Sequence, residues 1–416
     1  MTGHAGAAEL RVLYCTDTFP PQVNGVSIVT ALSVAGLRHR GWKCAVVAPR
    51  YPALMPRGPI QAAHELDKLV EIPSVAFPPY PDIRLAAPSY GLVATAVRQF
   101  KPDIVHSATE FMIGRLGQIA ASRARIVRLS SYHTDVSRYT EAYGLPWMRG
   151  FVSRYIARFH RRSARVFTPS VPAQADLAAL GVTAVEVWGR GVDIDAFSPA
   201  RRSQALRTAY GIDDSMVFLH VGRLAAEKGV DRIVRAFNRA RASLPAGAAR
   251  LIVAGAGPEE NALRTLAGPD AHFVGVLDRD KALPKLYASA DVFLFSSLTE
   301  TLGLVVLEAM AAGLPVVATP AGGVADHLRD EENGIAVPAN DVDAMANAIV
   351  SLTMDAARRR RLAAGARLTA LALDWESELD RLDASYRAVL ENAERGARAT
   401  SPRDIFEERA ARGAAY

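Results

Sequence analysis

Short, continuous apolar runs alternate with helix-length amphipathic segments along most of the chain. Runs of this kind are typical of parallel strands buried on both faces, because the intervening helices cover the sheet. The runs form two series: Arg11–Cys15, Lys43–Ala48, Asp103–Ser107, Arg125–Ser130, Arg165–Pro169 and Val185–Trp188, then Met216–Val221, Arg250–Ala254, His272–Val274, Asp291–Ser296, Val316–Thr319 and Ile335–Val337. Two series predict an α/β protein with two doubly wound, Rossmann-like domains.

The predicted boundary between the domains lies near Ser198–Gly211, where Pro199 and a basic, polar stretch interrupt the pattern. A chain of 416 residues exceeds one ordinary core and suits two domains. The predicted organisation is residues 1–198, residues 199–375, a charged amphipathic helix over 376–395 and a flexible polar tail over 396–416.

Prolines crowd the segment between Pro49 and Pro88, which holds nine of the 24 in the chain. Because proline fixes φ and donates no backbone hydrogen bond, this density predicts a loop-rich flap on the first domain. Arg84 lies in this segment, and a role of the flap in binding is one interpretation. A surface excursion without a role in binding is an equally open alternative.

Half of the residues are hydrophobic and 22% are charged, which predicts a folded chain. The longest apolar stretch contains Glu308 and Pro315, so no membrane span is expected. Met1–Glu9 shows no basic region followed by an apolar run, so no export signal is expected and a cytoplasmic location follows. Cys15 and Cys44 fall in predicted strands and are expected to be core thiols.

Positive charge is confined to the first half of the chain. Residues 1–198 hold 22 Lys and Arg against 14 Asp and Glu, a net charge of +8, whereas the remainder carries −2. This asymmetry indicates that the first domain faces an anionic partner, either nucleic acid or a lipid surface.

The segment Gly222–Gly229 follows the first strand of the second domain and carries Arg223 and Lys228. Two cations at the carboxyl end of a parallel strand can be aimed at one diphosphate, because ligands of open α/β sheets bind at that edge. The alternative is a solvated turn in which both cations lie beside Glu227.

Two carboxylates, Glu300 and Glu308, flank the start of an apolar helix predicted to begin near Leu304. Gly303 would let the backbone approach a ligand closely, and the helix start offers unpaired amides to a phosphate. An unpaired carboxylate in such apolar surroundings is costly, so hydroxyl or amide partners are expected for both glutamates.

The first domain offers two weaker signals at the same kind of sheet edge. Asn24 and Gly25 end the loop after the first strand and begin a helix, which places backbone amides near a bound group. His133 and Asp135 follow the fourth strand. A loop histidine satisfied by its own protein is the usual situation, but the position at the expected cleft favours ligand contact.

Two other motifs resemble well-known sites; the first is a weak match and the second is interpreted as a decoy. Gly255–Pro258 begins like a dinucleotide fingerprint but lacks the third glycine, which argues against a hydride-transfer dehydrogenase. Asp193 and Asp195 resemble a metal-binding Asp-x-Asp pair but lie near the domain boundary, away from a buried strand end. No metal site is therefore predicted.

The segment Trp147–Arg165 predicts a basic amphipathic helix. Aromatic residues recur every four positions and arginines cluster on an adjoining face. Such a helix fits in-plane contact with a membrane, and packing on its own sheet is an equally open alternative. Nucleic acid is disfavoured as a partner, because the remaining basic residues form no recognisable binding module.

With these motifs in hand, the chain resembles glycosyltransferase family 4, the retaining family with the GT-B fold. The motifs that carry the resemblance are Gly222-Arg223 with Lys228-Gly229, Gly255–Pro258, Gly191-Val192-Asp193 and Glu300–Thr319. A narrower likeness, to GDP-mannose-dependent α-mannosyltransferases of glycolipids and to sulfoquinovosyl-diacylglycerol synthases, rests on Pro21–Val26, Ser131–Asp135, Trp188–Asp193 and Glu300–Glu308. Many members have Gly-Phe where this chain has Thr301-Leu302, so sugar contacts there are expected to differ.

The resemblance implies two domains facing a central cleft, with the C-terminal helix crossing back to the first domain. It implies that Arg223 and Lys228 neutralise the leaving diphosphate, that Glu300 binds a donor-sugar hydroxyl and Glu308 the ribose, and that His133 contacts the transferred sugar. The donor-binding set is completed by Asn24, Gly25, Leu302, Gly303, Leu304 and Asp278, the last as a partner for guanine, with Asp135 and Arg84 on the acceptor or sugar side.

The expected reaction is transfer of a hexose from a nucleoside-diphosphate sugar to an acceptor hydroxyl, without a cofactor or obligatory metal. GDP-mannose is the expected donor and a lipid or glycan at the inner face of the cell membrane the expected acceptor. Three alternatives stay open: a UDP-sugar-dependent glucosyl or sulfoquinovosyl transferase, a sugar-nucleotide epimerase or phosphorylase of the same architecture, and a non-catalytic lipid- or nucleic-acid-binding module.

Overall fold

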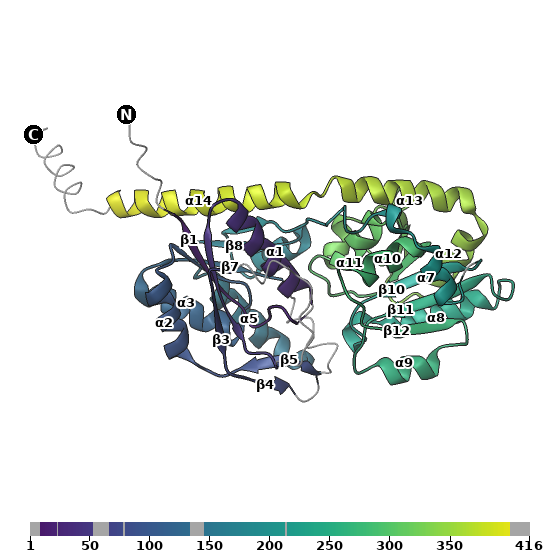
Figure 1. Ribbon diagram of the computed structural model, residues 1–416, viewed down its shortest axis with the longest axis horizontal. Helices are drawn as coiled ribbons and strands as arrows, with labels where there is room; N and C mark the ends of the chain where they lie inside the picture. Colours follow the sequence, from purple (N-terminus) through teal and green to yellow (C-terminus); the bar gives the residue numbers. More distant parts are fainter. Residues whose placement is uncertain are drawn as a thin grey trace, which may run out of the picture.

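The computed structural model describes residues 9–22, 24–52, 66–77, 80–133, 145–212 and 214–399. Two α/β halves lie side by side, and a long helical segment runs along one side of both (Figure 1). Each half is built on one parallel sheet, as the apolar runs predict.

The first half contains a seven-stranded sheet in the order β3-β2-β1-β6-β7-β8-β9, with every neighbouring pair parallel. Its strands are β1 (Arg11–Cys15), β2 (Lys43–Pro49), β3 (Lys68–Ile72), β6 (Ile104–Ser107), β7 (Val127–Ser131), β8 (Arg165–Thr168) and β9 (Val185–Val187). Its helices are α1 (Gly25–His39), α2 (Tyr90–Phe100), α3 (Met112–Ala124), α5 (Arg149–His160) and α6 (Val171–Ala179).

Alternation along β1 explains why this sheet is covered on both faces. Val12 and Tyr14 point into a core shared with α1, whereas Leu13 and Cys15 point into a core shared with α2 and α3. Successive side chains of a strand face opposite sides, so a wholly apolar strand requires two apolar layers. Cys15 and Cys44 lie buried in these two different cores as free thiols, which confirms their predicted place.

The second half contains a six-stranded parallel sheet in the order β12-β11-β10-β13-β14-β15. Its strands are β10 (Met216–Val221), β11 (Ala249–Ala254), β12 (Ala271–Gly275), β13 (Val292–Phe295), β14 (Val316–Ala318) and β15 (Gly334–Ala336). Its helices are α7 (Gln204–Ala209), α8 (Val230–Arg241), α9 (Glu260–Leu266), α10 (Ala282–Ser289), α11 (Leu304–Ala311) and α12 (Val342–Met354).

The proline-rich segment is more regular than expected. Within it, β3 extends the main sheet beside β2, and β4 (Ser74–Phe77) and β5 (Tyr80–Ala86) form an antiparallel hairpin. The prediction of a loop-rich flap is therefore wrong for residues 68–77 and 80–86, while residues 53–65 lie outside the described chain. The prolines are compatible with strands because Pro73 separates two of them and Pro81 lies on a strand that pairs on one side only.

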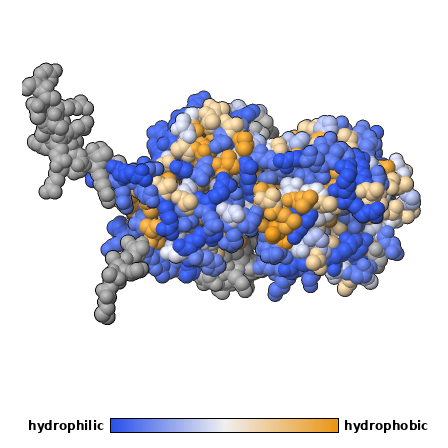
Figure 2. Space-filling view, turned by 90° about the horizontal axis from the view of Figure 1, so that it is seen from above, coloured by the Kyte–Doolittle hydropathy of each residue, from blue (hydrophilic) through white to orange (hydrophobic). Residues whose placement is uncertain are grey.

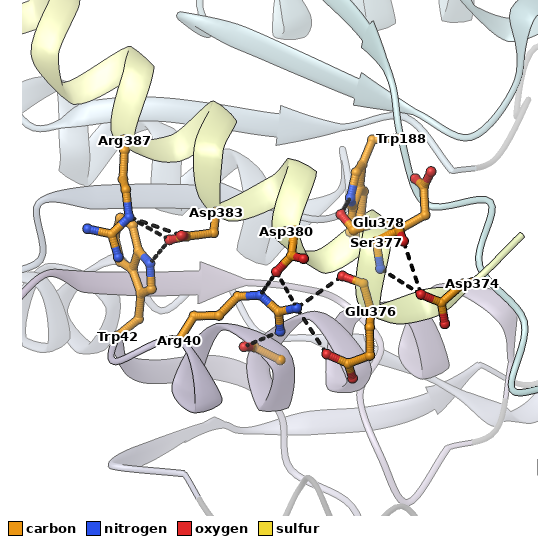
Figure 3. Close-up of polar contacts among 11 residues, drawn as sticks. Arg40, Trp42, Trp188, Asp374, Glu376, Ser377, Glu378, Asp380, Asp383 and Arg387 are labelled. Atoms are coloured by element: carbon orange, nitrogen blue, oxygen red, sulfur yellow. Dashed lines mark hydrogen bonds and ion pairs between the residues drawn. The ribbon is translucent and has the colours of Figure 1, made fainter.

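The chain returns to the first half through α13 (Ala356–Leu371) and α14 (Trp375–Ala399). Helix α14 continues past the predicted start of a tail at Gly396, and residues 400–416 lie outside the described chain. Figure 3 shows how α14 docks: the indole Nε1 of Trp42 donates to Asp383 Oδ1 at 2.6 Å, and that of Trp188 donates to the Glu378 carbonyl at 2.5 Å. Arg40 Nε donates to Asp380 Oδ1 at 2.8 Å.

Hydrophilic residues dominate the face seen in Figure 2, with separate hydrophobic areas over both halves. Among the described helices, none combines the length and the apolar character needed to cross a bilayer.

Candidate active site

The candidate site lies at the carboxyl edge of the second sheet, where strand order reverses direction. Strand β10 lies between β11, to which the chain proceeds directly, and β13, which the chain reaches after β12 by crossing to the other side of β10. Loops that leave such neighbouring strands diverge and open a crevice for ligands. The loop after β10 carries Arg223 and Lys228, and the loop after β13 carries Glu300.

One ion pair lies within the first of these loops, and a second joins the two loops. The Arg223 guanidinium contacts the buried Glu227 carboxylate within one turn, and the Lys228 ammonium contacts Glu300 from the other loop. Burial alone would raise the pKa of Glu300, but the positive charge and hydrogen bond of Lys228 hold it below its ordinary value. The structure therefore brings Arg223, Lys228 and Glu300 together, as the sequence predicts.

Glu308 is fully buried and has a cationic partner that the sequence reading missed. Arg279 Nη1 lies 2.5 Å from Glu308 Oε1, and the Tyr287 hydroxyl donates to Oε2 at 3.1 Å. Burial raises the pKa of Glu308, against the opposing influence of Arg279. The sequence predicts hydroxyl or amide partners for both glutamates, and the Tyr287 hydroxyl confirms this for Glu308. A cation is also a close partner of each glutamate, because a buried carboxylate needs charge compensation.

Helix α11 begins as predicted at Leu304, with Gly303 as its N-cap residue at φ +76°. That left-handed conformation favours glycine, so the turn itself requires Gly303. The Leu302 side chain packs in the core of the second domain. Only the Leu302 backbone is therefore suited to ligand contact, and the amides at the start of α11 remain the helix-end donors of the site.

Asp278 is exposed in the turn before α10, and its Oδ1 accepts from the amides of Asp280 and Lys281 at 3.0 and 2.8 Å. These two hydrogen bonds fix the orientation of the Asp278 carboxylate, and Arg279 is the next residue in the chain. Asp278 and the Arg279–Glu308 pair thus belong to the same corner of the second domain.

His220 is a second residue that sequence reasoning missed. It is the penultimate residue of β10, is buried and lies beside Gly222, and its Nδ1 lies 3.1 Å from the Leu294 carbonyl. Burial lowers the pKa of His220 to about 4, so the ring is neutral at pH 7. The sequence pattern gives no sign that His220 lies near the site, because its position within an apolar strand indicates a core residue.

On the first domain, Asn24 caps α1. Its Oδ1 accepts from the Ser27 amide at 2.9 Å, and its Nδ2 donates to the Thr18 hydroxyl at 2.7 Å. A Cβ built on Gly25 would meet no protein atom within 4 Å, so packing within the protein does not require glycine there. The structure places Asn24 and Gly25 at the carboxyl edge of the first sheet, after β1, where the sequence predicts them.

His133 lies at the cleft and touches the second domain through its backbone. Its carbonyl accepts from the Thr301 hydroxyl, and burial lowers the pKa of its imidazole to about 4. A small pocket nearby is lined by Tyr132 and Ser170 of the first domain and by Glu300 of the second. The residues predicted on the two sides of the cleft are thus brought together at His133 and Glu300.

Three other predicted sites need separate comment. Arg84 Nη2 donates to the Ser74 carbonyl at 2.7 Å within the β4–β5 hairpin, so the contacts described for it are local. Asp135 lies outside the described residues. Asp193 Oδ1 accepts from the Ala196 amide at 2.8 Å and so stabilises a turn. Within the described part of the chain, no three acidic, histidine or cysteine side chains group as metal ligands.

Comparison with protein families gives two matches that together span both domains. The model described as Glycosyltransferase Family 4 matches residues 23–196, and the model described as Glycosyl transferases group 1 matches residues 215–355. A GDP-mannose-dependent alpha-mannosyltransferase of Mycobacterium tuberculosis is 34% identical over 381 residues, covering 91% of this chain and 97% of that protein. Sulfoquinovosyl transferase SQD2 of Arabidopsis thaliana is 32% identical over 323 residues, covering 75% and 62%.

Solved structures agree on the fold. Alr3699/HepE of Anabaena, crystallised in complex with UDP, matches with a TM-score of 0.72 at 20% identity, covering 91% of this chain and 100% of that one. Sucrose-phosphate synthase of Thermosynechococcus elongatus matches with a TM-score of 0.71 at 20% identity, covering 92% and 100%. At these identities the likeness concerns the fold alone.

Proposed function

The chain belongs to glycosyltransferase family 4, with the GT-B fold and a nucleotide-sugar donor, and we propose that it transfers mannose from GDP-mannose to a hydroxyl of a membrane glycolipid. We further propose that the α configuration of the sugar is retained. The observation that carries the proposal is the convergence of Arg223, Lys228 and Glu300 at the switch point of the second sheet.

The proposed chemistry rests on stabilising a departing diphosphate. Arg223 and Lys228 supply positive charge, and the amides at the start of α11 add the helix-end field near Leu304. Glu300 accepts from a sugar hydroxyl and Glu308 lies at the ribose. The leaving phosphate accepts the proton of the acceptor hydroxyl, so positioning and charge stabilisation carry the step without a resident metal.

Two observations support GDP-mannose as the donor. A relative that matches over 91% of this chain is a GDP-mannose-dependent alpha-mannosyltransferase. Asp278 presents a carboxylate next to the corner formed by Arg279 and Glu308, and a carboxylate can accept from the N1 and N2 donors of guanine.

A donor screen tests the proposal. Release of nucleoside diphosphate is measured with GDP-mannose, UDP-glucose and UDP-sulfoquinovose, with and without a lipid extract as acceptor. GDP-mannose is expected to be turned over fastest. Strong turnover of a UDP-sugar with none of GDP-mannose would replace the guanine assignment with the UDP-dependent alternative.

Removing both site cations is expected to lower turnover by about two to three orders of magnitude, because the departing diphosphate loses its charge partners. The variant is Arg223→Ala with Lys228→Ala, and turnover of the donor is the measurement. Arg264→Ala is the matched control, since Arg264 also pairs with a glutamate four residues away, Glu260, but on an exposed face of α9. If the chain were a non-catalytic binding protein, donor turnover would be the same in the unchanged protein, the double variant and Arg264→Ala.

The acceptor proposal rests on an exposed aromatic surface of the first domain. A short turn, η2 (Pro146–Met148), precedes α5 and leaves Trp147 77% exposed, and Phe151 of α5 is 70% exposed. The later half of α5 instead packs into the protein through Ile156 and Phe159. One end of this segment therefore packs into the protein, as the packing interpretation predicts, and the other end projects beside exposed arginines. We propose that the exposed end contacts an anionic lipid surface on the cytoplasmic face.

Vesicle binding tests the membrane part of the proposal. The chain is expected to sediment with vesicles of phosphatidylcholine and phosphatidylserine at low salt, and Trp147→Ser with Phe151→Ser is expected to weaken this binding at least about tenfold. Met354→Ser is the control, because Met354 is 70% exposed at the end of α12 in the other domain. Equal binding by both variants, or no binding to anionic vesicles, would favour a soluble acceptor.

A further inference from the structure

A carboxylate of the second domain reaches across the cleft to the first. Asp326 ends η5 (Gly322–Asp326), a short turn of the second domain. Its Oδ2 accepts from the backbone amide of Val171 at 2.8 Å and lies 2.9 Å from Nη2 of Arg190. The side chain of Asp326 is only 12% exposed and that of Arg190 23% exposed, so the ion pair is largely shielded from water, whereas the contact with the Val171 amide lies at the surface.

The Val171 amide is a favourable target for this carboxylate. Val171 is the first residue of α6, and the first amides of a helix have no partner within the helix. Ser170 already caps Ala173 through its hydroxyl, and Asp326 satisfies a further amide. Negative charge at this end also complements the helix dipole. The N-terminus of a first-domain helix is thus completed by the second domain.

The turn that carries Asp326 packs directly on the Glu300 segment. The Gly323 amide donates to the Glu300 carbonyl at 2.7 Å. A Cβ at Gly322 would lie 2.2 Å from the Glu300 carbonyl oxygen, so this approach admits only glycine. The next residue, Thr301, donates its hydroxyl to the His133 carbonyl of the first domain. Asp326 and Glu300 therefore belong to one packed unit that meets the first domain at two points.

We propose that Asp326 is the latch that holds the cleft closed, and that it acts as a positioning residue for Glu300. When Asp326 binds the start of α6 and Arg190, the Glu300 segment is held against His133. Release of the latch lets the two domains separate for donor entry and product exit. The kinetic consequence rests on the proposed function, whereas the change in domain separation does not.

The test compares Asp326→Ala and Asp326→Asn with Asp341→Ala. Asp341 is a matched control, because its Oδ1 accepts from the Ala344 amide at 2.8 Å and so caps α12 within the second domain. Small-angle X-ray scattering of the ligand-free proteins reports domain separation, and initial rates with GDP-mannose give kcat and KM. Thermal unfolding of each variant measures how much stability is lost when a helix N-terminus loses its capping carboxylate, separately from any change in domain separation.

Asp326→Ala is expected to increase the radius of gyration and to raise KM for the donor about tenfold, with a smaller change in kcat. Asp326→Asn keeps an acceptor for Val171 but loses the charge opposite Arg190, so it should fall between. Asp341→Ala should lower the unfolding temperature while scattering and KM stay unchanged.

The latch is overturned if Asp326→Ala and Asp326→Asn scatter like the unchanged protein, or if they differ from Asp341→Ala in neither scattering nor KM. If the unchanged protein binds no sugar nucleotide, the proposed function fails, and scattering alone still decides whether Asp326 holds the domains together. Asp326→Asn keeps the side chain's size, so it serves this purpose even if the alanine variant does not fold.

Discussion

Each cation of the candidate site is paired with a carboxylate of its own domain. The pairs are Arg223 with Glu227, Lys228 with Glu300, and Arg279 with Glu308. A diphosphate that binds here competes with carboxylates for the same cations. The strength of nucleotide binding therefore depends on the glutamates as well as on the cations.

Glu300→Gln is expected to bind GDP about five to ten times more tightly than the unchanged protein, because Lys228 no longer divides its charge between Glu300 and the phosphates. Transfer should fall in the same variant, since an amide is a poorer acceptor for a sugar hydroxyl. Titration calorimetry with GDP measures the first effect. Glu331→Gln removes an exposed partner of Arg358 and serves as the control. Unchanged or weaker GDP binding by Glu300→Gln would contradict this account.

The sequence allows the positions of Arg223, Lys228 and Glu300 to be predicted, because each follows a recognisable buried strand and parallel strands share one carboxyl edge. It does not reveal Arg279 as the partner of Glu308. That pair depends on how the loop after β12 approaches α11, and no local pattern encodes such an approach.

At the scale of elements, helix α14 completes the first domain with a buried polar cluster. The Tyr386 hydroxyl lies 2.7 Å from that of Tyr14 and also contacts Nδ1 of His106, whose Nε2 lies 2.7 Å from the Ser131 hydroxyl. Together with the contacts in Figure 3, this cluster fixes α14 on the sheet. Buried polar groups of this kind depend on every partner being present.

Tyr386→Phe is expected to lower the free energy of unfolding by about 1–3 kcal/mol, because Tyr14 and His106 each lose a buried partner while the ring is kept. Urea denaturation measures the loss. Tyr90→Phe is the control, since the ring of Tyr90 still lies under the guanidinium of Arg123 without its hydroxyl. Equal losses in the two variants would show that the cluster adds nothing.

The sequence predicts an element correctly where a single pattern, such as a continuous apolar run, marks it, as in the central strands of both sheets. It does not predict strands β3, β4 and β5, because the prolines near them indicate loops. Prolines are nevertheless tolerated there, since Pro73 lies between two strands and β5 pairs on one side only. For helix α5 the sequence leaves two interpretations open, packing on the sheet or contact with a membrane. One amphipathic pattern runs along the whole helix, so it does not reveal that the first half is exposed and the second half buried.

At the scale of the whole molecule, four buried histidines make stability depend on pH. Burial lowers the pKa of His106 to about 3 and those of His133, His220 and His327 to about 4. The unfolded chain binds protons on these rings near pH 6.5, and the folded chain does so only at lower pH. Stability is therefore fully present above pH 6.5 and is lost as the pH falls from 6.5 toward 4.

One such histidine is expected to lower the free energy of unfolding by about 2 kcal/mol between pH 7 and pH 5. Urea unfolding at pH 7, 6 and 5 measures the slope. His220→Gln should flatten it by about one proton, because glutamine does not titrate. His39→Gln, at an exposed position, should leave it unchanged. Parallel profiles for His220→Gln and the unchanged protein would contradict the account.

The return of the last helix has a consequence for how the protein is made. One core of the first domain contains Trp375, Leu382, Tyr386 and Val389 together with residues from Val12 to Trp188. During synthesis this core stays incomplete until nearly the whole chain has left the ribosome, so the second domain can fold before the first is finished. For the same reason, halves exchanged between relatives at a single cut would carry the wrong last helix, and a working chimaera needs α14 to travel with the first domain.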